Sequence, residues 1–326
     1  MSTLSNSLRL LRAFAVLFAL AAPTSVFAQY STRPIRLVVS VPPGGAPDMA
    51  ARVLGEKLGQ ALGQPVVVDN RVGANGNIAA ELVAKAAPDG HTLLLGQDSI
   101  FVVNPHIYKR MSVDVRRELA PVATVATNMF VLAVNPSLPV KSFPEFIEYA
   151  RKANPPLRYA SGGNGSMHHL TMELLKQRAD IDLVHVPYKG GSPATMAALS
   201  GEVAAMFAGT SNAPQIKAGK LRALAVTGSK RSDVFPGVPT IAELYPGFEM
   251  HIWLGVFTPA ATPQAIVSKL REEVNKALAL PDVKEKLNAA GGMQPLQLAP
   301  AEFSAVIRRD SAKFEKLVRQ VGVTLD

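Results

Sequence analysis

The chain has 326 residues, of which 48% are apolar and 18% charged, a composition that indicates a globular protein of about two domains and excludes a disordered or fibrous chain. No cysteine is present, which excludes disulfides, thiolate nucleophiles, cysteine-ligated zinc and iron–sulfur clusters. The formal net charge of +9 suits anionic partners without identifying one.

The first 28 residues have the pattern of a secretory signal. Arg9 and Arg12 precede an apolar run over 13–22, and Val26-Phe27-Ala28 forms a small-x-small end. The run is half of the roughly 20 residues that span a bilayer, so a signal peptide is expected rather than a membrane anchor. We therefore expect cleavage after Ala28 and a mature, soluble protein in the periplasm.

Short apolar runs alternate with helical patterns through the rest of the chain, which predicts α/β domains built on largely parallel sheets. The expected strands are 35–39, 66–68, 92–95, two pieces within 122–134, 157–160, 184–186, 203–207, 221–226 and 252–257. The expected helices are 48–62, a segment ending near 86, 143–152, a segment ending at 178, 193–199, 214–218, 264–278, 283–290 and 301–321. No Pro/Ser-rich linker separates two halves, so we expect ordered strands to connect any two domains.

Two glycine-rich turns, 42–48 and 161–166, each join an expected strand to an expected helix. The first amides of a helix have no partner within the helix, and the helix dipole adds positive potential there. Ligands of open α/β sheets bind at these carboxyl ends of strands. Two such turns from opposite domains could hold an anion without any cation, although turns with no ligand would have the same sequence.

Motifs for other chemistries are missing. The chain has no P-loop, no strand-linked GxGxxG, no GxSxG elbow and no HExxH. Ser166 precedes His168 and His169 by two and three residues, a spacing that does not place an imidazole behind the hydroxyl, and no acid is nearby. The six histidines are scattered and aromatic residues are only 6%, so neither a metal site nor a nucleic-acid surface is predicted.

Ordered sequence motifs recur along almost the whole chain. They are Arg33–Val39, Pro42–Asp48 with Ala51-Arg52, Val67–Arg71, Pro88–Leu94, Asn104-Pro105, Tyr159–Leu170, His185–Gly190, Ala218–Thr227, Val238–Thr240 and Trp253-x-Gly255. In these motifs the chain resembles the periplasmic solute-binding proteins of the tripartite tricarboxylate transporter system, also called the Bug family.

The resemblance implies a two-lobed periplasmic-binding-protein fold (Venus flytrap, type II-like), with a largely parallel sheet in each lobe. Lobe 1 would be discontinuous and comprise 29–130 plus 253–326, and lobe 2 would comprise 131–252. Crossover strands would lie near 130–134 and 252–257. The resemblance further implies that Ser161 and Gly165-Ser166 hold a ligand carboxylate, while the turn 44–46 and the segment 96–98 reach it partly through waters.

The residues expected to bind the ligand are Gly44, Gly45, Ala46, Asp48, Gln97, Ser161, Asn164, Gly165, Ser166, His168, Tyr188 and Thr210. One departure from the family bears on the ligand. Many relatives carry an acidic residue after a Met-Phe strand, whereas Met206-Phe207 is followed here by Ala208-Gly209-Thr210-Ser211. A ligand with an amino group is therefore less favoured than a plain carboxylate.

These observations lead to the hypothesis of a non-catalytic, monomeric receptor for a small organic carboxylate, without cofactor, metal, nucleic acid or stable membrane insertion. The receptor would deliver its ligand to an inner-membrane permease of the tripartite tricarboxylate type. Two alternatives remain open at this stage. One is an exported serine hydrolase with His168 as base and Ser161 or Ser166 as nucleophile, and the other is a ligand sensor for a membrane kinase.

Overall fold

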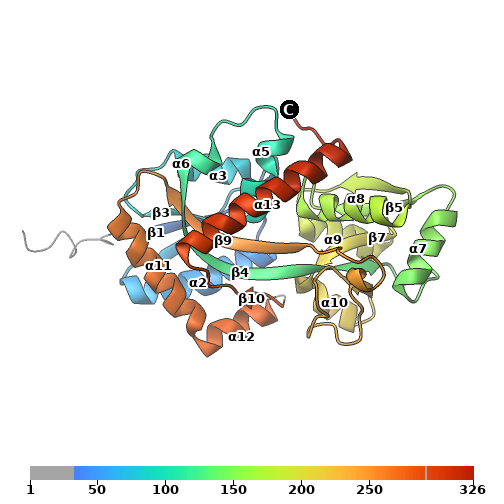
Figure 1. The fold of residues 1–326 in the computed structure, drawn as a ribbon. Coiled ribbons are helices and arrows are strands. Elements are labelled where there is room, and N and C mark those ends of the chain that lie inside the picture. Colours follow the sequence, from blue (N-terminus) through green and yellow to red (C-terminus); the bar gives the residue numbers. More distant parts are fainter. Residues whose placement is uncertain (1–32, 291) are drawn as a thin grey trace, which may run out of the picture. The chain divides into compact units, whose positions relative to one another are not determined.

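The computed structural model describes residues 33–290 and 292–326. The expected signal peptide lies outside the described residues. Within them, no helix combines the length and the apolar character needed to span a bilayer. Strand β4 (Leu119–Val134) belongs to two sheets, and β9 (His251–Pro259) runs beside its first part (Figure 1).

The first sheet has the strand order β2-β1-β3-β9-β4-β10. Its other members are β1 (Ile35–Val39), β2 (Val66–Asn70), β3 (Thr92–Gln97) and β10 (Gln294–Pro295). Strands β1, β2 and β3 pair in parallel, and β9 is antiparallel to both β3 and β4. Because Val39 pairs with Asn70 and with Leu95, the C-terminal ends of three parallel strands meet at one edge.

The second sheet has the order β6-β5-β7-β4-β8. It adds β5 (Leu157–Ser161), β6 (Leu183–Pro187), β7 (Ala205–Gly209) and β8 (Arg222–Val226). Strand β5 is parallel to β6 and β7, whereas β4 is antiparallel to β7 and β8. Ser161 pairs with Pro187, so the turns that follow β5 and β6 lie next to each other.

Strand β4 changes partners between Met129 and Phe130. It pairs with β9 up to Met129 and with β7 and β8 beyond it. The prediction of two separate pieces here was wrong, because the polar residues that suggested a break bond to neighbouring segments. The Thr127 hydroxyl donates to the Ile252 carbonyl at 3.0 Å, and the Asn128 amide donates to the Thr210 hydroxyl at 2.5 Å. The lobe boundaries implied by the resemblance remain a prediction.

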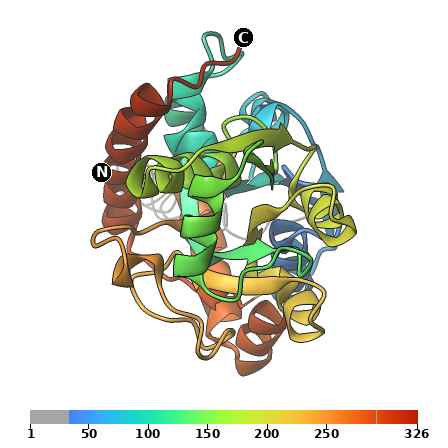
Figure 2. The same ribbon diagram turned by 90° about the vertical axis from the view of Figure 1, so that its right-hand side faces the viewer.

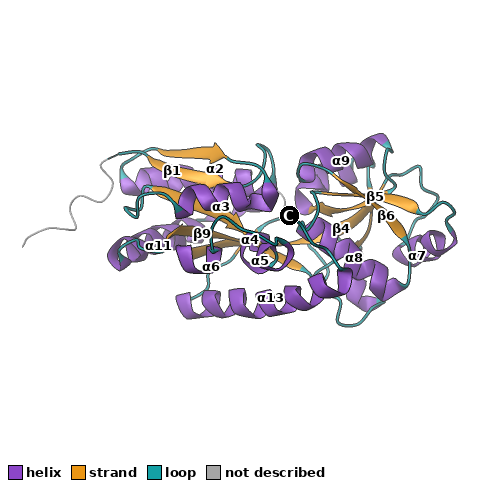
Figure 3. Cartoon of the chain, turned by 90° about the horizontal axis from the view of Figure 1, so that it is seen from above, coloured by secondary structure: helices purple, strands orange, loops and turns teal. Residues whose placement is uncertain are grey.

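Helices cover both faces of the strands (Figure 3). They are α2 (Ala46–Leu62), α3 (Asn77–Ala84), α4 (Asp98–Val102), α5 (Asn104–Ile107), α6 (Val115–Glu118), α7 (Phe143–Lys152), α8 (Met167–Ala179), α9 (Gly191–Ser200), α10 (Ala213–Lys217), α11 (Gln264–Ala279), α12 (Pro281–Ala289) and α13 (Pro300–Val321). Helix α2 begins at Ala46 rather than Asp48 because Gly45 is its N-cap and Pro47 fits its first turn. Figure 2 is turned so that α7 (green) and α8 (yellow-green) face the viewer.

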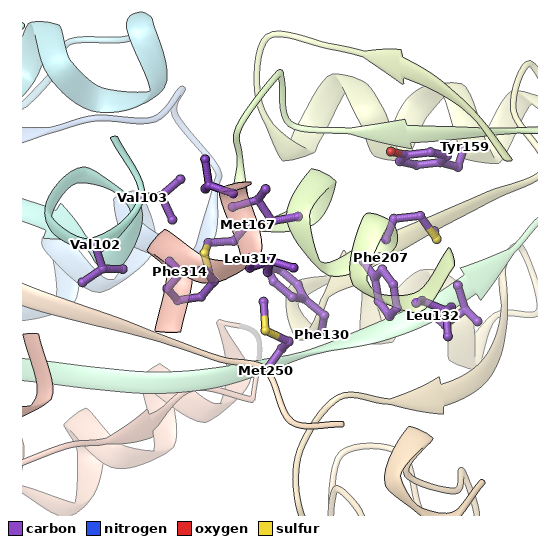
Figure 4. Packing of buried hydrophobic residues seen from close by; sticks show 14 of the residues in the cluster. Val102, Val103, Phe130, Leu132, Tyr159, Met167, Phe207, Met250, Phe314 and Leu317 are labelled. Atoms are coloured by element: carbon purple, nitrogen blue, oxygen red, sulfur yellow. The ribbon is translucent and has the colours of Figure 1, made fainter. Parts of the chain in front are cut away.

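A buried apolar cluster joins helix α13 to both sheets. Helix α13 packs against α4, α8 and β4. In Figure 4, Phe130 of β4 and Met167 of α8 lie close to Phe314 and Leu317 of α13, and all four are nearly inaccessible to solvent. Full burial of such a side chain contributes about 1.5–3 kcal/mol. This packing anchors α8, the helix that follows the second glycine turn.

Candidate functional site

Both glycine turns found in the sequence lie where a parallel strand ends and a helix begins. The first connects β1 to α2, and the second connects β5 to α8. A third turn, 188–190, connects β6 to α9. In α/β sheets these carboxyl ends of strands are the usual place for ligands.

Asp48 organises the first turn. Its carboxylate accepts hydrogen bonds from the Gly44 amide at 2.9 Å, from the Asn70 side chain at 2.9 Å and from Arg52 Nε at 3.0 Å. Burial alone would raise the pKa of this carboxyl, but the hydrogen bonds from Arg52, Gly44 and Asn70 lower it below its ordinary value. Asp48 was expected to bind the ligand; the structure places it behind the turn, with both oxygens committed to protein donors.

Two main-chain amides at the start of α2 have no hydrogen-bond acceptor within the described residues. Gly45 N donates to the Pro42 carbonyl at 3.3 Å, and the first helical bond runs from Met49 N to the Gly45 carbonyl at 3.0 Å. The amides of Ala46 and Asp48 precede that bond, and neither donates to an acceptor within the described residues. Together with the helix dipole, they form a positive end suited to an anion.

The second turn is folded around Ser161 and His169. The Ser161 hydroxyl is fully buried, lies 2.6 Å from His185 Nε2 and accepts from the Gly163 amide at 3.1 Å. Gly165 N donates to His169 Nδ1 at 3.1 Å. Ser166 caps α8, because its hydroxyl accepts from His169 N at 3.3 Å. The serines expected to hold a ligand therefore also fix the shape of the turn.

A stack of rings supports this turn from behind. The ring of His169 lies 4.0 Å from that of His185 at an interplanar angle of 8°, and His185 lies 5.0 Å from Tyr159. Burial lowers the pKa of both histidines to about 4. Both rings are therefore neutral at pH 7, and because Gly165 N donates to His169 Nδ1, the single ring proton of His169 is on Nε2. Sequence reasoning assigned no role to His185, because only the pairing of β5 with β6 in the structure places it beside Tyr159.

His168 lies between two turns. Its ring packs 4.7 Å from that of Phe130. A Cβ added to Gly162 would come within 3.1 Å of His168 Nδ1, and one added to Gly191 would come within 3.6 Å of Nε2. The distance at Gly162 is tighter than an ordinary Cβ contact, so the ring disfavours a side chain there, whereas the distance at Gly191 is an ordinary van der Waals contact. Burial lowers the pKa of His168 to about 4, so this ring is also neutral at pH 7.

The structure brings the three turns together. Gly190 N donates to the Gly162 carbonyl at 3.2 Å, which joins the second and third turns. A Cβ added to Gly190 would lie 3.3 Å from Pro42 Cδ, so the first turn approaches the third. Gly190 has φ +111°, a conformation that favours glycine and permits this approach. The starts of α2, α8 and α9 are therefore neighbours.

Other residues expected at the site have different surroundings. The Tyr188 hydroxyl donates to Glu202 at 2.8 Å. The part of Tyr188 next to Gly163 is its main-chain carbonyl, which would lie 3.3 Å from a Cβ added to Gly163. Thr210 is buried, accepts from Asn128, and lines a cavity of about 410 Å³ beside α10. Gln97 is half-buried at the end of β3, and Asn164 is exposed at the tip of its turn.

No group of three or more histidine or acidic side chains suited to a metal ion occurs in 33–290 and 292–326.

Comparisons with known proteins identify the family to which the chain is similar. Residues 50–323 match the model of the tripartite tricarboxylate transporter family receptor. Protein BugT of Bordetella pertussis is 37% identical over 329 residues, covering 98% of this chain and 99% of that protein. The structure of R. palustris Rpa4515 with adipate has a TM-score of 0.87 at 35% identity, covering 91% of this chain and 99% of that one. MatC from Rhodopseudomonas palustris with bound malate has a TM-score of 0.82 at 32% identity, covering 89% of this chain and 100% of that one. The predicted α/β periplasmic-binding-protein fold is thereby confirmed. The sheets are mixed rather than largely parallel, because β4 and β9 run antiparallel to their neighbours.

Proposed function

We propose that this chain, which belongs to the tripartite tricarboxylate transporter receptor family, captures a small organic carboxylate between the turns 42–46 and 161–166. The observation that supports this most directly is the meeting of three helix N-termini, those of α2, α8 and α9, at these two turns and the neighbouring turn 188–190. Two structural relatives, at 35% and 32% identity, were solved with the dicarboxylates adipate and malate. Such an arrangement of amides fits small oxyanions, including phosphate, sulfate and carboxylate, and the ligands of these two relatives favour a carboxylate.

The proposed site holds the anion with main-chain groups. At the start of α8, the amides of Met167 and His168 precede the first helical bond, and those of Gly191 and Ser192 do so in α9. None of these four amides donates to an acceptor in the part of the chain that the structure describes. Because such donors bring no opposite formal charge into the site, the ligand can be released again, as a transport receptor requires.

The charge around the site favours a plain carboxylate over an amino acid. An amino group needs a carboxylate partner in a buried site. Strand β7 ends in Ala208-Gly209 rather than an acidic residue, and the Asp48 carboxylate is already committed to protein donors. We therefore expect dicarboxylates and other simple acids to bind more tightly than aspartate or glutamate.

Delivery completes the proposed role. The protein would act in the periplasm after removal of residues 1–28. Lobes 29–130 plus 253–326 and 131–252 would close on the ligand, and a monomer would present it to an inner-membrane permease. Closure requires that the ligand bind the closed state more tightly than the open one. Loss of uptake of the identified acid in a deletion strain supports permease delivery, whereas unchanged uptake with a lost transcriptional response indicates a sensor.

The serine hydrolase remains the alternative, because the structure contains a serine–histidine pair. The pair is Ser161 with His185, rather than Ser161 or Ser166 with His168. The Ser161 hydroxyl is inaccessible and already accepts from Gly163, and His185 stacks between two rings. A nucleophile needs access to its substrate and a base oriented by a third group. The burial of Ser161 therefore favours a structural role for this pair.

Calorimetry over a panel of mono-, di- and tricarboxylic acids, aromatic acids and amino acids tests the proposal. We expect one-to-one binding of at least one plain acid, recovery of that acid unchanged, and a higher melting temperature in its presence. Absence of binding across the panel, or cleavage of model esters with labelling of Ser161 by a serine-directed probe, contradicts the proposal.

A further inference from the structure

Three segments far apart in the sequence converge on Gly165, in the middle of the second glycine turn. The Asn75 side-chain amide donates to the Gly165 carbonyl at 3.3 Å. A Cβ added to Gly165 would lie 2.1 Å from Ile107 Cδ1 and 3.7 Å from Leu325 Cδ1. Gly165 has φ +71°, so its conformation also favours glycine. The turn that faces the proposed ligand is therefore approached from the side of the first sheet by one polar side chain, Asn75, and two apolar ones, Ile107 and Leu325.

The position of Asn75 is fixed by an amide network. Asn75 Nδ2 donates to Asn104 Oδ1 at 2.6 Å, and Asn104 Nδ2 donates back to the Asn75 carbonyl at 3.0 Å and to Asn77 Oδ1 at 2.6 Å. Asn104 is fully buried. Asn75 itself has φ +50°, a left-handed conformation that costs an L-residue free energy. Such conformations persist where the surroundings enforce them, often at functional positions.

The apolar half of the contact comes from the chain's last residues. Leu325 N donates to the Ile107 carbonyl at 2.7 Å, and Lys109 N donates to the Leu325 carbonyl at 3.0 Å. This pairing holds residue 325 beside the end of α5. Ile107 is almost fully buried. The C-terminal residues thus help to build the surface on which Gly165 rests.

We propose that Asn75, Ile107 and Leu325 form a latch, a set of positioning residues that holds the ligand-binding turn at Gly165 and sets the rate at which ligand leaves. The inference rests on the proposed function. Gly165 N donates to His169 on one side while its carbonyl accepts from Asn75 on the other. The turn is therefore held between helix α8 and the latch. The latch side chains contact the turn and not the unpaired main-chain amides that would bind the ligand. Their loss should therefore raise the dissociation rate constant and leave the association rate constant nearly unchanged.

Stopped-flow binding of the acid found by calorimetry tests the latch in the full-length mature protein. We expect Asn75→Ala to raise the dissociation rate constant about fivefold, the effect of one neutral hydrogen bond, with the association rate constant nearly unchanged. The matched control is Asn135→Ala, which removes side-chain amide bonds to the carbonyls of Ala198 at 2.8 Å and Leu199 at 3.3 Å in helix α9, away from Gly165. Equal dissociation rates in wild type and Asn75→Ala, or equal increases in both variants, overturn the latch.

A double substitution tests the apolar contact. Gly165→Ala should weaken binding because its Cβ meets Ile107, and adding Ile107→Ala should restore part of the lost affinity. Strictly additive losses contradict the contact. If wild type binds no acid, the proposed function fails, and hydrogen exchange still decides on the latch. Amides of 162–166 should then exchange faster in Asn75→Ala than in Asn135→Ala, and equal exchange in the two variants overturns it.

Discussion

The main-chain amide of Trp253 in β9 donates to the Asp98 carboxyl at 3.2 Å. The indole N–H of the same residue, the only tryptophan in the chain, donates to Asp310 of α13 at 3.0 Å. Burial raises the pKa of Asp98 to about 8, with a smaller contribution from the charge of Asp310, against the opposing hydrogen bonds of Ser99 and Trp253. The only tryptophan therefore lies beside Asp98, the residue directly after β3, whose carboxyl changes charge near neutral pH.

Trp253 emission should follow the ionisation of Asp98. We expect a fluorescence change centred near pH 8, absent in Asp98→Asn. Because the folded pKa lies above the ordinary 3.8, the stability that the neutral acid provides is present at low pH and is lost as the pH rises toward 8. In Asp310→Asn the midpoint should move down, since a neighbouring negative charge is gone. A fluorescence transition that persists unchanged in Asp98→Asn contradicts this assignment.

Acid should destabilise the protein through the two stacked histidines. Their folded pKa values are near 4, below the ordinary 6.5, so the unfolded chain binds more protons between those values. Their contribution to stability is complete above about pH 6.5 and is lost as the pH falls toward 4. In His169→Gln, the side-chain oxygen can accept from Gly165 N but does not titrate. We expect the melting temperature of this variant to fall by fewer degrees between pH 7 and 4.5 than that of wild type. A larger loss in the variant than in wild type contradicts this account.

Asp48→Ala should weaken ligand binding as well as folding. The substitution removes the acceptor for Gly44 N and Asn70, so the first turn loses its support and the free energy of unfolding should fall by about 2 kcal/mol. We expect the dissociation constant of the acid to rise about tenfold. Asp69→Ala is the matched control, because Asp69 pairs with Arg36 and Arg71 at the edge of the first sheet. This variant should cost about 1 kcal/mol or less and leave the dissociation constant unchanged. Equal effects on binding in both variants contradict the role of Asp48.

Local patterns were enough to predict most of the fold. Helix α7 matches its predicted bounds because Ser142 caps it and Pro144 fits its first turn. Helices α4, α5 and α6 were missed, since segments of four or five residues contain too few turns to show a period. The continuity of β4 was missed because it depends on pairing with β9, β7 and β8, and on side-chain bonds from Thr127 to β9 and from Asn128 to Thr210.

The candidate site was predictable only as far as its backbone. Glycine patterns identify the turns, because the strand-to-helix connections and close approaches there require that residue. They do not identify which side chains meet the turns. His185 reaches Ser161 through strand pairing, and Asn75 reaches Gly165 across 90 positions of sequence. The expectation for Tyr188 relied on its position after a strand, whereas its hydroxyl reaches Glu202 one helix away.

Ser161→Ala separates the receptor from the hydrolase. The substitution leaves the Gly163 amide without its acceptor and His185 Nε2 without its partner, so the free energy of unfolding should fall by about 1–3 kcal/mol and the dissociation constant should rise. Ser137→Ala, which removes a hydroxyl that donates to Asn135 at the surface, should change neither quantity by a comparable amount. Calorimetry and thermal melts measure both, and an ester-hydrolysis assay is run in parallel. We expect no turnover in wild type or in either variant, because the Ser161 hydroxyl is buried and acts in holding the turn. Turnover in wild type that disappears only in Ser161→Ala contradicts the receptor and identifies Ser161 as a nucleophile.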